Sequence, residues 1–352
     1  MDDLSFYHGG SIYEIKRRYK KDVIDFSANI NPLGLKRNFR KEFVRSYKRI
    51  LHYPDFEAKD LIKQIAQYWK INDENILLGN GSTELIYLIT HTYRPKKVII
   101  PSPTFSEYER ASRSIKCKLR FLNLKEKNNF ALNISNSARA DIFFISNPNN
   151  PTGNLLLEDQ RSGDISGKLT VIDEAFMDFL PDERRHTFIW KAIENKRIIV
   201  LRSFTKFFAL PGLRVGYLVA HKELIETLKR FQPPWNINSI AQFLAQGVLN
   251  DKGYIKKTRE FIKRERDFLF NELVKTKGFM PYPSVTNFLL IKIINKGINS
   301  SILTESLIQR GILIRDCTNF RGLNNEFIRA AVRSHKENLK LIRSLRELLC
   351  KN

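Results

Sequence analysis

Short apolar runs alternate with segments of helical periodicity between about residues 60 and 235. Apolar residues recur at helical spacing from Asp55 to Trp69, and a second helix is predicted from about Ser82. Strands alternating with helices predict an α/β fold in which a largely parallel sheet is covered by helices on both faces. The predicted strands are Ile76–Leu78, KVII (97–100) before a Pro-Ser-Pro break, KLRFLNL (118–124), DIFFIS (141–146), four residues ending at Asp173 within KLTVIDEAFMDF (168–179), RIIVLRSF (197–204) and GYLVA (216–220).

The pattern changes after RFQPPWNIN at residues 230–238. A long helical region runs from about Ser239 to Lys275, NFLLIKI and GILIRDC are typical of strands, and a terminal amphipathic helix extends through Leu349. These elements predict a second, smaller α+β domain. We therefore expect an N-terminal arm (1–40) that packs with the small domain, a large domain (41–235) and a small C-terminal domain (236–352).

The arm is rich in Gly, Asn and Pro in two clusters, His8–Ser11 and DFSANINPLG (25–34), with a short helix predicted in IYEIKRRYKKD between them. Such residues mark backbone that turns and offers NH groups and amides. Asn29 and Asn31 are either turn residues or substrate-binding amides, and the sequence leaves both interpretations open.

Composition narrows the class of protein. A length of 352 residues suggests about two domains, and the 42% of hydrophobic residues is enough for a sizeable core. No run approaches the ~18 apolar residues of a membrane span, and MDDLSFYHGG lacks the pattern of a signal peptide. We therefore expect a cytoplasmic protein without a membrane partner.

Cysteines and charge exclude further classes. Cys117, Cys317 and Cys350 are far apart and form no CxxC pair, so we expect free thiols and no metal site. The formal charge of +23 is spread along the chain without an arginine-rich arm or a zinc finger, so we expect no nucleic-acid partner. A positive field does favour anionic substrates.

Lys206 is the most informative residue, because Phe204, Phe207 and Phe208 bracket it in an apolar run. A lysine that loses hydration tends toward a lowered pKa, and its neutral amine forms Schiff bases with carbonyl substrates or with pyridoxal phosphate (PLP). The alternative is a buried strand followed by a loop in a lysine-rich chain. Donors suited to a phosphate stand nearby at Ser203, Thr205 and Arg214.

Other candidate residues stand where strands end and helices begin. The backbone of Ser82 and Thr83 is expected at a helix N-terminus, which favours a phosphate. Phe105 lies at a strand-to-helix junction, where ligands of α/β sheets bind. Asp173 ends a buried strand and needs a cation, either an arginine or a protonated pyridine nitrogen, and Glu174 competes for that role.

In this order the motifs resemble the fold-type I PLP-dependent enzymes of the class I/II aminotransferase superfamily, and within it most closely the threonine-phosphate decarboxylases. This resemblance implies a large domain with a mostly parallel seven-stranded sheet between helices, a smaller α+β domain, and PLP as cofactor. It covers nearly the whole chain. The motifs that carry it are HGG (8–10), DFSANINPLG (25–34), GNGSTE (79–84), PTFSEYERA (103–111), NPNNPTG (147–153), DEAFMDF (173–179), LRSFTKFFALPGLRVGYLVA (201–220), PPWNIN (233–238), GILIRDCTNFRGL (311–323) and IRAAVRS (328–334).

The resemblance also implies roles around the cofactor. Lys206 would hold PLP as a Schiff base and later move protons, and Asp173 would pair with the pyridinium nitrogen. Asn150 would donate to the phenolic oxygen, and Phe105 would stack on the ring. The aminotransferase relatives have a tyrosine where this chain has Phe176. The cofactor phosphate would be bound by Ser82, Thr83, Ser203, Thr205 and Arg214, and by Tyr53 from a neighbouring subunit, which implies a homodimer with shared active sites.

For the substrate, the resemblance implies that Arg329 grips the α-carboxylate, with Arg333 as a competitor, and that Arg315 lies near a substrate phosphate. His8 and Asn29 would add donors. The activity implied is decarboxylation of L-threonine O-3-phosphate to (R)-1-amino-2-propanol O-2-phosphate and CO2, for the linker of the cobalamin nucleotide loop. Histidinol-phosphate aminotransferase and a decarboxylase of L-serine O-phosphate are the alternatives.

Overall fold

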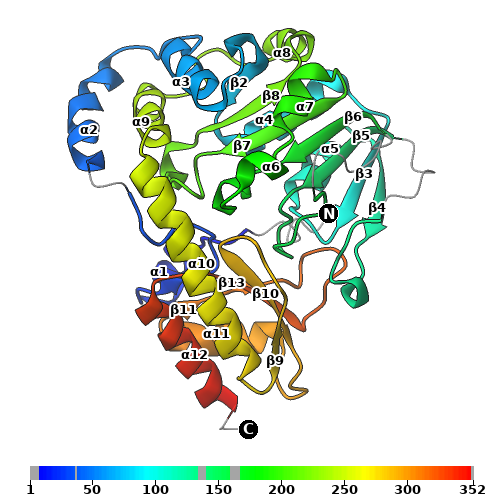
Figure 1. Ribbon diagram of the computed structural model, residues 1–352. Coiled ribbons are helices and arrows are strands. Elements are labelled where there is room, and N and C mark those ends of the chain that lie inside the picture. The colour runs from blue at the N-terminus through cyan, green and yellow to red at the C-terminus, as the bar shows by residue number, and fades with distance from the viewer. Residues whose placement is uncertain (1–7, 36–37, 134–139, 159–166, 350–352) are drawn as a thin grey trace.

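The computed structural model describes residues 8–35, 38–133, 140–158 and 167–349. Its largest element is a seven-stranded sheet with the strand order β2-β8-β7-β6-β5-β3-β4, shown in the upper part of Figure 1. Strands β3 to β7 pair in parallel, and β8 is antiparallel to both of its neighbours. The strands are β2 (Ile76–Gly79), β3 (Lys97–Ser102), β4 (Lys118–Asn123), β5 (Ala140–Ser146), β6 (Gly167–Asp173), β7 (Ile198–Ser203) and β8 (Gly216–Ala220). The predicted strands and the mostly parallel seven-stranded sheet are confirmed.

Both faces of this sheet are buried, as expected for parallel strands covered by helices. Along β7, Ile199 and Leu201 belong to the core on the side of α4, α5 and α8, whereas Ile198 and Val200 belong to the core on the other side. The helices of the first side are α4 (Gly81–Tyr93), α5 (Glu107–Ser114) and α8 (Lys222–Lys229). Those of the second side include α3 (Lys59–Trp69), α7 (Ile189–Glu194) and α9 (Ser239–Leu249).

A second sheet of four antiparallel strands lies in the lower part of Figure 1, with the order β12-β13-β10-β9. The long helix α10 runs from the large sheet to this smaller one. The strands are β9 (Phe279–Pro281), β10 (Phe288–Ile293), β12 (Arg315–Asp316) and β13 (Phe327–Ala331). The helices of this part are α10 (Lys252–Val274), α11 (Ser300–Gln309) and α12 (His335–Leu349). The predicted domain boundaries at residues 40 and 235 stay predictions.

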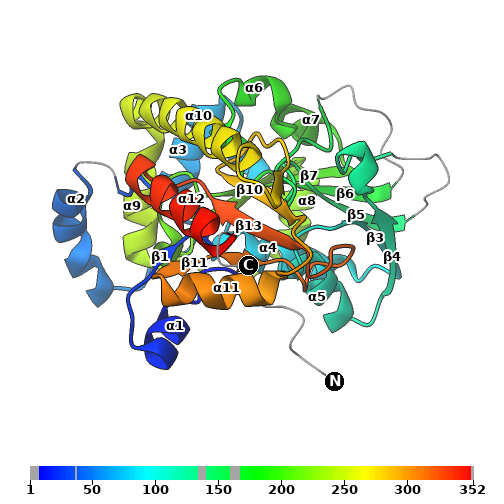
Figure 2. The ribbon, with the colours of Figure 1, turned by 90° about the horizontal axis from the view of Figure 1, so that it is seen from below.

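The N-terminal arm is built into the smaller part of the molecule. Strand β1 (Ile24–Asp25) pairs in parallel with β11 (Ile312–Leu313), and Ile15 of α1 (Ile12–Tyr19) packs on α11. Figure 2 shows α1, β1 and β11 together beside α11. Gly9 fits against the backbone of the second cluster, because a Cβ there would lie 2.1 Å from the carbonyl oxygen of Ser27. The arm therefore brings its polar clusters to the region between the two sheets.

The structure differs from the sequence prediction at three element boundaries. Helix α3 begins at Lys59 rather than at Asp55, because the Asp55 carboxylate accepts the Lys59 backbone N–H at 2.9 Å from before the helix. The long helical region is two helices, and Asp251 caps the second one. GILIRDC is not one strand, since β11 pairs with β1 and β12 pairs with β13.

Candidate active site

A cavity of about 270 Å³ lies at the carboxyl ends of β5, β6 and β7, where Ser146, Asp173 and Ser203 line it. This is the edge at which α/β sheets bind ligands. The arm contributes to the lining, and so does the small sheet. The predicted site residues that line the cavity are His8, Asn29, Ser82, Thr83, Phe105, Asn150, Asp173, Ser203, Thr205, Lys206, Arg214, Arg315 and Arg329.

Lys206 follows β7 in a loop whose neighbours are apolar. Phe204, Phe207 and Phe208 are all buried, as their sequence pattern suggested. Burial, followed by the charges of Arg329 and Arg214, lowers the pKa of Lys206 to about 8. The side chain is therefore far easier to deprotonate than a solvated lysine, which is what a nucleophilic amine requires.

The loop that carries Lys206 is fixed from the arm by Asn31. The Asn31 backbone N–H donates to the carbonyl oxygen of Lys206 at 3.1 Å, and its amide NH2 group donates to the carbonyl oxygen of Phe207 at 2.8 Å. Asn29 instead lines the cavity, and its side-chain oxygen has no hydrogen-bond partner within the described residues. Asn31 thus supports the loop of Lys206, whereas Asn29 lines the cavity.

Asp173 lies at the end of β6 and faces the same cavity as Lys206. Its Oδ2 accepts the hydroxyl of Tyr108 at 2.7 Å, and its Oδ1 accepts the backbone N–H of Ala175 at 3.0 Å. Burial raises the pKa of Asp173, while the Tyr108 and Ala175 donors and the Lys206 charge oppose that rise. The carboxylate is therefore held in a fixed orientation beside the amine.

Glu174, the competing carboxylate, faces away from the cavity. It accepts from the Arg202 guanidinium at 3.0 Å and from the Phe188 backbone at 2.7 Å. Burial raises its pKa to about 7 although Arg202 opposes the shift. Of the two candidate carboxylates, Glu174 has an arginine partner, whereas Asp173 lines the cavity and has no arginine partner within the described residues.

The start of α4 forms a cradle suited to a phosphate. Gly81 has a φ of +77°, and a Cβ there would lie 2.5 Å from Nη2 of Arg214, so only glycine lets the guanidinium approach the helix start. The Ser203 and Thr205 hydroxyls lie 2.8 Å apart on the same lining. Backbone N–H groups at a helix start, two hydroxyls and a guanidinium fit an anionic group, so these residues fit the phosphate of PLP.

Arg329 of β13 crosses to the large sheet from the smaller one. Its Nη1 donates to Oδ1 of Asn150, and its Nη2 donates to the carbonyl oxygen of Ser27 at 2.7 Å. Its buried Nε has no partner within the described part of the chain, and burial lowers its pKa to about 10. Arg333 pairs with Glu337 at 3.0 Å and does not line the cavity.

Arg315 of β12 approaches from the same side. Its guanidinium carbon lies 5.1 Å from the ring centre of Phe320, and Nη2 donates to Oδ1 of Asn319 at 2.6 Å. Phe320 also lines the cavity. The two arginines from the small sheet give the cavity a second end whose positive charge suits an anion, besides the cradle at α4.

Tyr53, like Arg333, lies outside the lining of this cavity. Tyr53 is 82% exposed, and its ring lies tilted against that of Trp235, with 4.9 Å between the ring centres. Phe176 does line the cavity and meets Phe288 edge-on at 5.0 Å. Sequence reasoning assigned no role to Tyr108 or Phe320, although both lie in the quoted motifs.

The expected absence of a metal site is not contradicted, since the described residues contain no cluster of His, Cys, Asp and Glu side chains that could hold a metal ion. Cys117 and Cys317 are free thiols, and Cys350 lies outside the described residues. No helix among the described residues is long and apolar enough to cross a bilayer.

Comparison with known proteins gives consistent matches along the chain. A model of the family "Aminotransferase class I and II" matches residues 21–345. The threonine-phosphate decarboxylase of Salmonella typhimurium is 34% identical, covering 97% of this chain and 96% of that protein. The adenosylcobalamin biosynthesis bifunctional protein CobDQ of Leptospira interrogans is 34% identical, covering 95% of this chain and 40% of that protein.

Among solved structures, the histidinol-phosphate aminotransferase from Clostridium acetobutylicum superposes with a TM-score of 0.84 at 32% identity. The superposition covers 93% of this chain and 99% of that one. Relatives with two different activities are therefore similar to this chain to a comparable degree.

Proposed function

The chain belongs to the class I and II aminotransferase family, and on that basis we propose that it is a PLP-dependent enzyme that decarboxylates L-threonine O-3-phosphate to (R)-1-amino-2-propanol O-2-phosphate. The observation that carries this proposal is that Lys206 and Asp173 face one cavity, which also receives Arg315 and Arg329 from the small sheet. Similarity to the Salmonella typhimurium decarboxylase over nearly the full chain supports the choice of reaction. Phe176, where the aminotransferase motif has tyrosine, supports it as well.

The residues assigned to the cofactor are those already placed around the cavity. With PLP bound, Lys206 would hold its aldehyde carbon through Nζ, and Asp173 would keep the ring nitrogen protonated. Asn150, whose amide oxygen is taken by Arg329, keeps its NH2 group for the phenolic oxygen. When bound, PLP supplies an electron sink that weakens the bonds at the α carbon of an amino acid.

The protein residues determine which of those bonds breaks. Arg329 binds the α-carboxylate in a planar fork, and Arg315 binds the phosphate at the other end of the substrate. Two fixed anchors hold the carboxylate in one orientation, so the choice between losing CO2 and losing the α proton is geometric. With PLP and substrate in place, the Lys206 amine, which lines this cavity, would move protons there.

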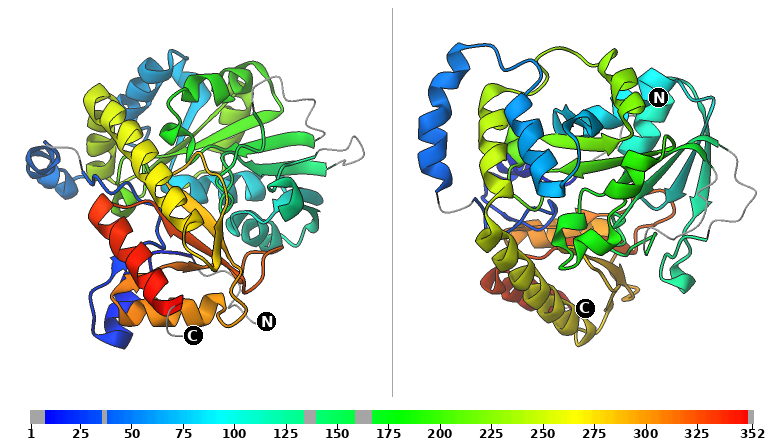
Figure 3. Two further views of the ribbon diagram at one scale, coloured as in Figure 1. Left: turned by 60° about the horizontal axis from the view of Figure 1, so that its bottom comes forward. Right: turned by 45° about the horizontal axis from the view of Figure 1, so that its top comes forward.

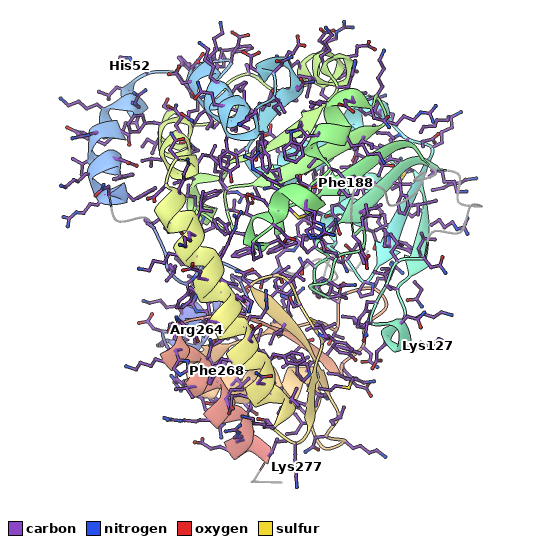
Figure 4. The ribbon with its side chains drawn as sticks, in the orientation of Figure 1. His52, Lys127, Phe188, Arg264, Phe268 and Lys277 are labelled. Atoms are coloured by element: carbon purple, nitrogen blue, oxygen red, sulfur yellow. The ribbon has the colours of Figure 1, made fainter. Side chains whose placement is uncertain are left out.

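We also assign a homodimer in which Tyr53 completes the neighbour's cavity. Tyr53 is exposed and does not line the cavity of its own chain. It follows α2 (Phe39–Ser46) and the short helix η2 (Tyr47–Leu51), which Figure 3 shows at the outer edge of the molecule, and Figure 4 places the adjacent His52 there too. This segment exposes several large apolar side chains, namely Phe43, Val44, Tyr47, Ile50, Leu51, Tyr53 and Phe56. Exposed apolar patches of this kind mark protein interfaces.

The proposed place in metabolism is synthesis of the aminopropanol linker of cobalamin in the cytoplasm, and the CobDQ relative supports the pathway. The test of the reaction is direct. Purified enzyme with PLP is incubated with L-threonine O-3-phosphate and, separately, with histidinol phosphate plus 2-oxoglutarate. Release of CO2 supports the proposal, whereas glutamate formation alone would assign the chain to the aminotransferases. L-serine O-phosphate, which lacks one methyl group, is expected to react less efficiently by a factor of about 10 to 200.

A further inference from the structure

Helix α5 carries two acidic residues that face different segments bordering the cavity. The helix begins directly after Phe105 and Ser106, which line the cavity. Glu107 meets the arm and Glu109 meets the loop at residues 317–323, between β12 and β13. The arm and this loop are far apart in the sequence, and α5 is the element that both of them contact through a carboxylate.

Glu107 is 4% exposed and forms a hydrogen bond with His8, an arm residue whose imidazole lines the cavity. His8 Nε2 lies 2.8 Å from Oε1 of Glu107, and the Tyr87 hydroxyl donates to Oε2 at 3.1 Å. Burial opposes ionisation of Glu107, but the bonds from His8 and Tyr87 leave its pKa lowered. Because Nε2 is engaged by Glu107, the rotation of the imidazole is fixed and Nδ1 is directed away from the carboxylate.

Glu109 grips the loop by a two-point contact. Nε of Arg321 donates to Oε2 at 3.2 Å and Nη2 donates to Oε1 at 2.9 Å, which is the fork geometry of strong arginine–carboxylate pairs. The same guanidinium lies 4.2 Å from the ring centre of Phe121 on the large sheet. Phe320, the residue before Arg321, lines the cavity and supports the Arg315 guanidinium.

We propose that Glu107 and Glu109 are positioning residues for the substrate: Glu107 holds His8, and Glu109 holds the 317–323 loop with Phe320 and Arg315, at the end of the cavity that receives the substrate phosphate. The inference rests on the proposed function for the identity of that phosphorylated substrate. Neither carboxylate lines the cavity, and although Glu107 accepts the Tyr87 hydroxyl farther along α4, neither contacts the cradle at the start of that helix. Both are therefore expected to act on substrate binding rather than on cofactor binding.

The test compares Glu107→Ala and Glu109→Ala with Glu223→Ala, a control whose carboxylate pairs with Lys196 at 2.5 Å on α8, away from the cavity. In the holoenzyme, KM for L-threonine O-3-phosphate is expected to rise about tenfold in each of the two variants, the size of a lost charged hydrogen bond. We expect kcat within about threefold of wild type, and an unchanged dissociation constant for PLP. Glu107→Gln and Glu109→Gln keep a hydrogen-bond acceptor and are expected to recover part of the loss.

Inhibition by L-threonine, which lacks the phosphate, separates positioning from general damage. Its inhibition constant is expected to change less than twofold in the two variants, because the affected end of the cavity is the phosphate end. KM values within twofold of wild type, or a parallel loss of PLP affinity and of the melting temperature, would overturn the inference. If the wild-type enzyme itself does not act on threonine phosphate, the proposed function fails instead, and the same variants are then compared by histidinol phosphate binding.

Discussion

Two carboxylates that are adjacent in the chain, Asp173 and Glu174, lie on opposite sides of the large sheet and have different partners. Asp173 faces the cavity, where a tyrosine hydroxyl and a backbone N–H orient it and no arginine neutralises it within the described residues. Glu174 faces a fully buried cluster around Arg202. A buried carboxylate that keeps an unneutralised charge is available for a ligand cation, whereas one that is already paired stabilises the fold.

The cluster around Arg202 consists of buried charges that are paired with one another. Arg202 is fully buried and contacts Glu174, Asp178 and Glu183 at 3.0, 2.8 and 2.9 Å. Arg259 of α10 adds a second guanidinium, 2.6 Å from Glu183. Since α10 runs on to the small sheet, this cluster ties the two sheets together, while Lys206 on the cavity side has a lowered pKa and remains reactive.

The largest effect is expected from a substitution that removes the Lys206 amine from the cavity. Lys206→Ala is expected to abolish both turnover and the visible absorbance of protein-bound PLP, because no other amine among the described residues lines the cavity. Absorbance spectroscopy after gel filtration measures the cofactor, and CO2 release measures turnover. Retention of either property would refute the role of Lys206.

The next largest effect is expected from disrupting the buried charge cluster around Arg202. Arg202→Leu leaves three buried carboxylates with one remaining guanidinium, so the free energy of unfolding is expected to fall by about 3–5 kcal/mol. Urea denaturation followed by circular dichroism measures this loss. The folded fraction is expected to retain PLP, since Arg202 does not line the cavity. A variant as stable as wild type would contradict the assignment of the cluster to stability.

A matched pair sharpens the comparison at the two adjacent carboxylates. Asp173→Asn is expected to lower kcat by about 10²–10³, the usual cost of removing one preorganised electrostatic group from an active site. Glu174→Gln is expected to leave kcat within a few-fold and to lower the free energy of unfolding by about 1–3 kcal/mol instead. Steady-state kinetics and denaturation of both variants test this contrast. Equal losses of kcat in the two variants would contradict the different roles of the two carboxylates.

The smallest effect is a pH dependence of the cavity amine. With a pKa lowered to about 8, Lys206 becomes neutral as the pH rises through 8, and below that value its neutral fraction falls tenfold per pH unit. The rate at which cofactor-free protein binds PLP is therefore expected to rise with pH and to level off above 8. Free lysine, measured in parallel, corrects for the ionisation of PLP. A rate that keeps rising to pH 10 would show a solvated amine.

The sequence predicted the strands and their alternation with helices, because apolar periodicity is a local signal, and strand-end polar residues such as Asp173 are visible in the same way. Asn150, Arg315 and Arg329, which line the cavity, were predicted from the family resemblance instead. The sequence did not predict Tyr108 as the partner of Asp173, or Glu107 and Glu109 as the partners of the arm and the loop. These contacts join segments that are up to 212 residues apart, and no local pattern encodes which of many charged residues will meet.

The chain by itself determined that Lys206 stands among aromatic residues and that acids end a buried strand. Only the tertiary structure decided that Asp173 faces the cavity and Glu174 faces an arginine, that Arg329 rather than Arg333 reaches the cavity, and that Asn31 holds a loop while Asn29 lines the cavity. The physical reason is that the role of a polar group depends on whether the fold supplies its partner, and partners are brought together by packing rather than by order along the chain.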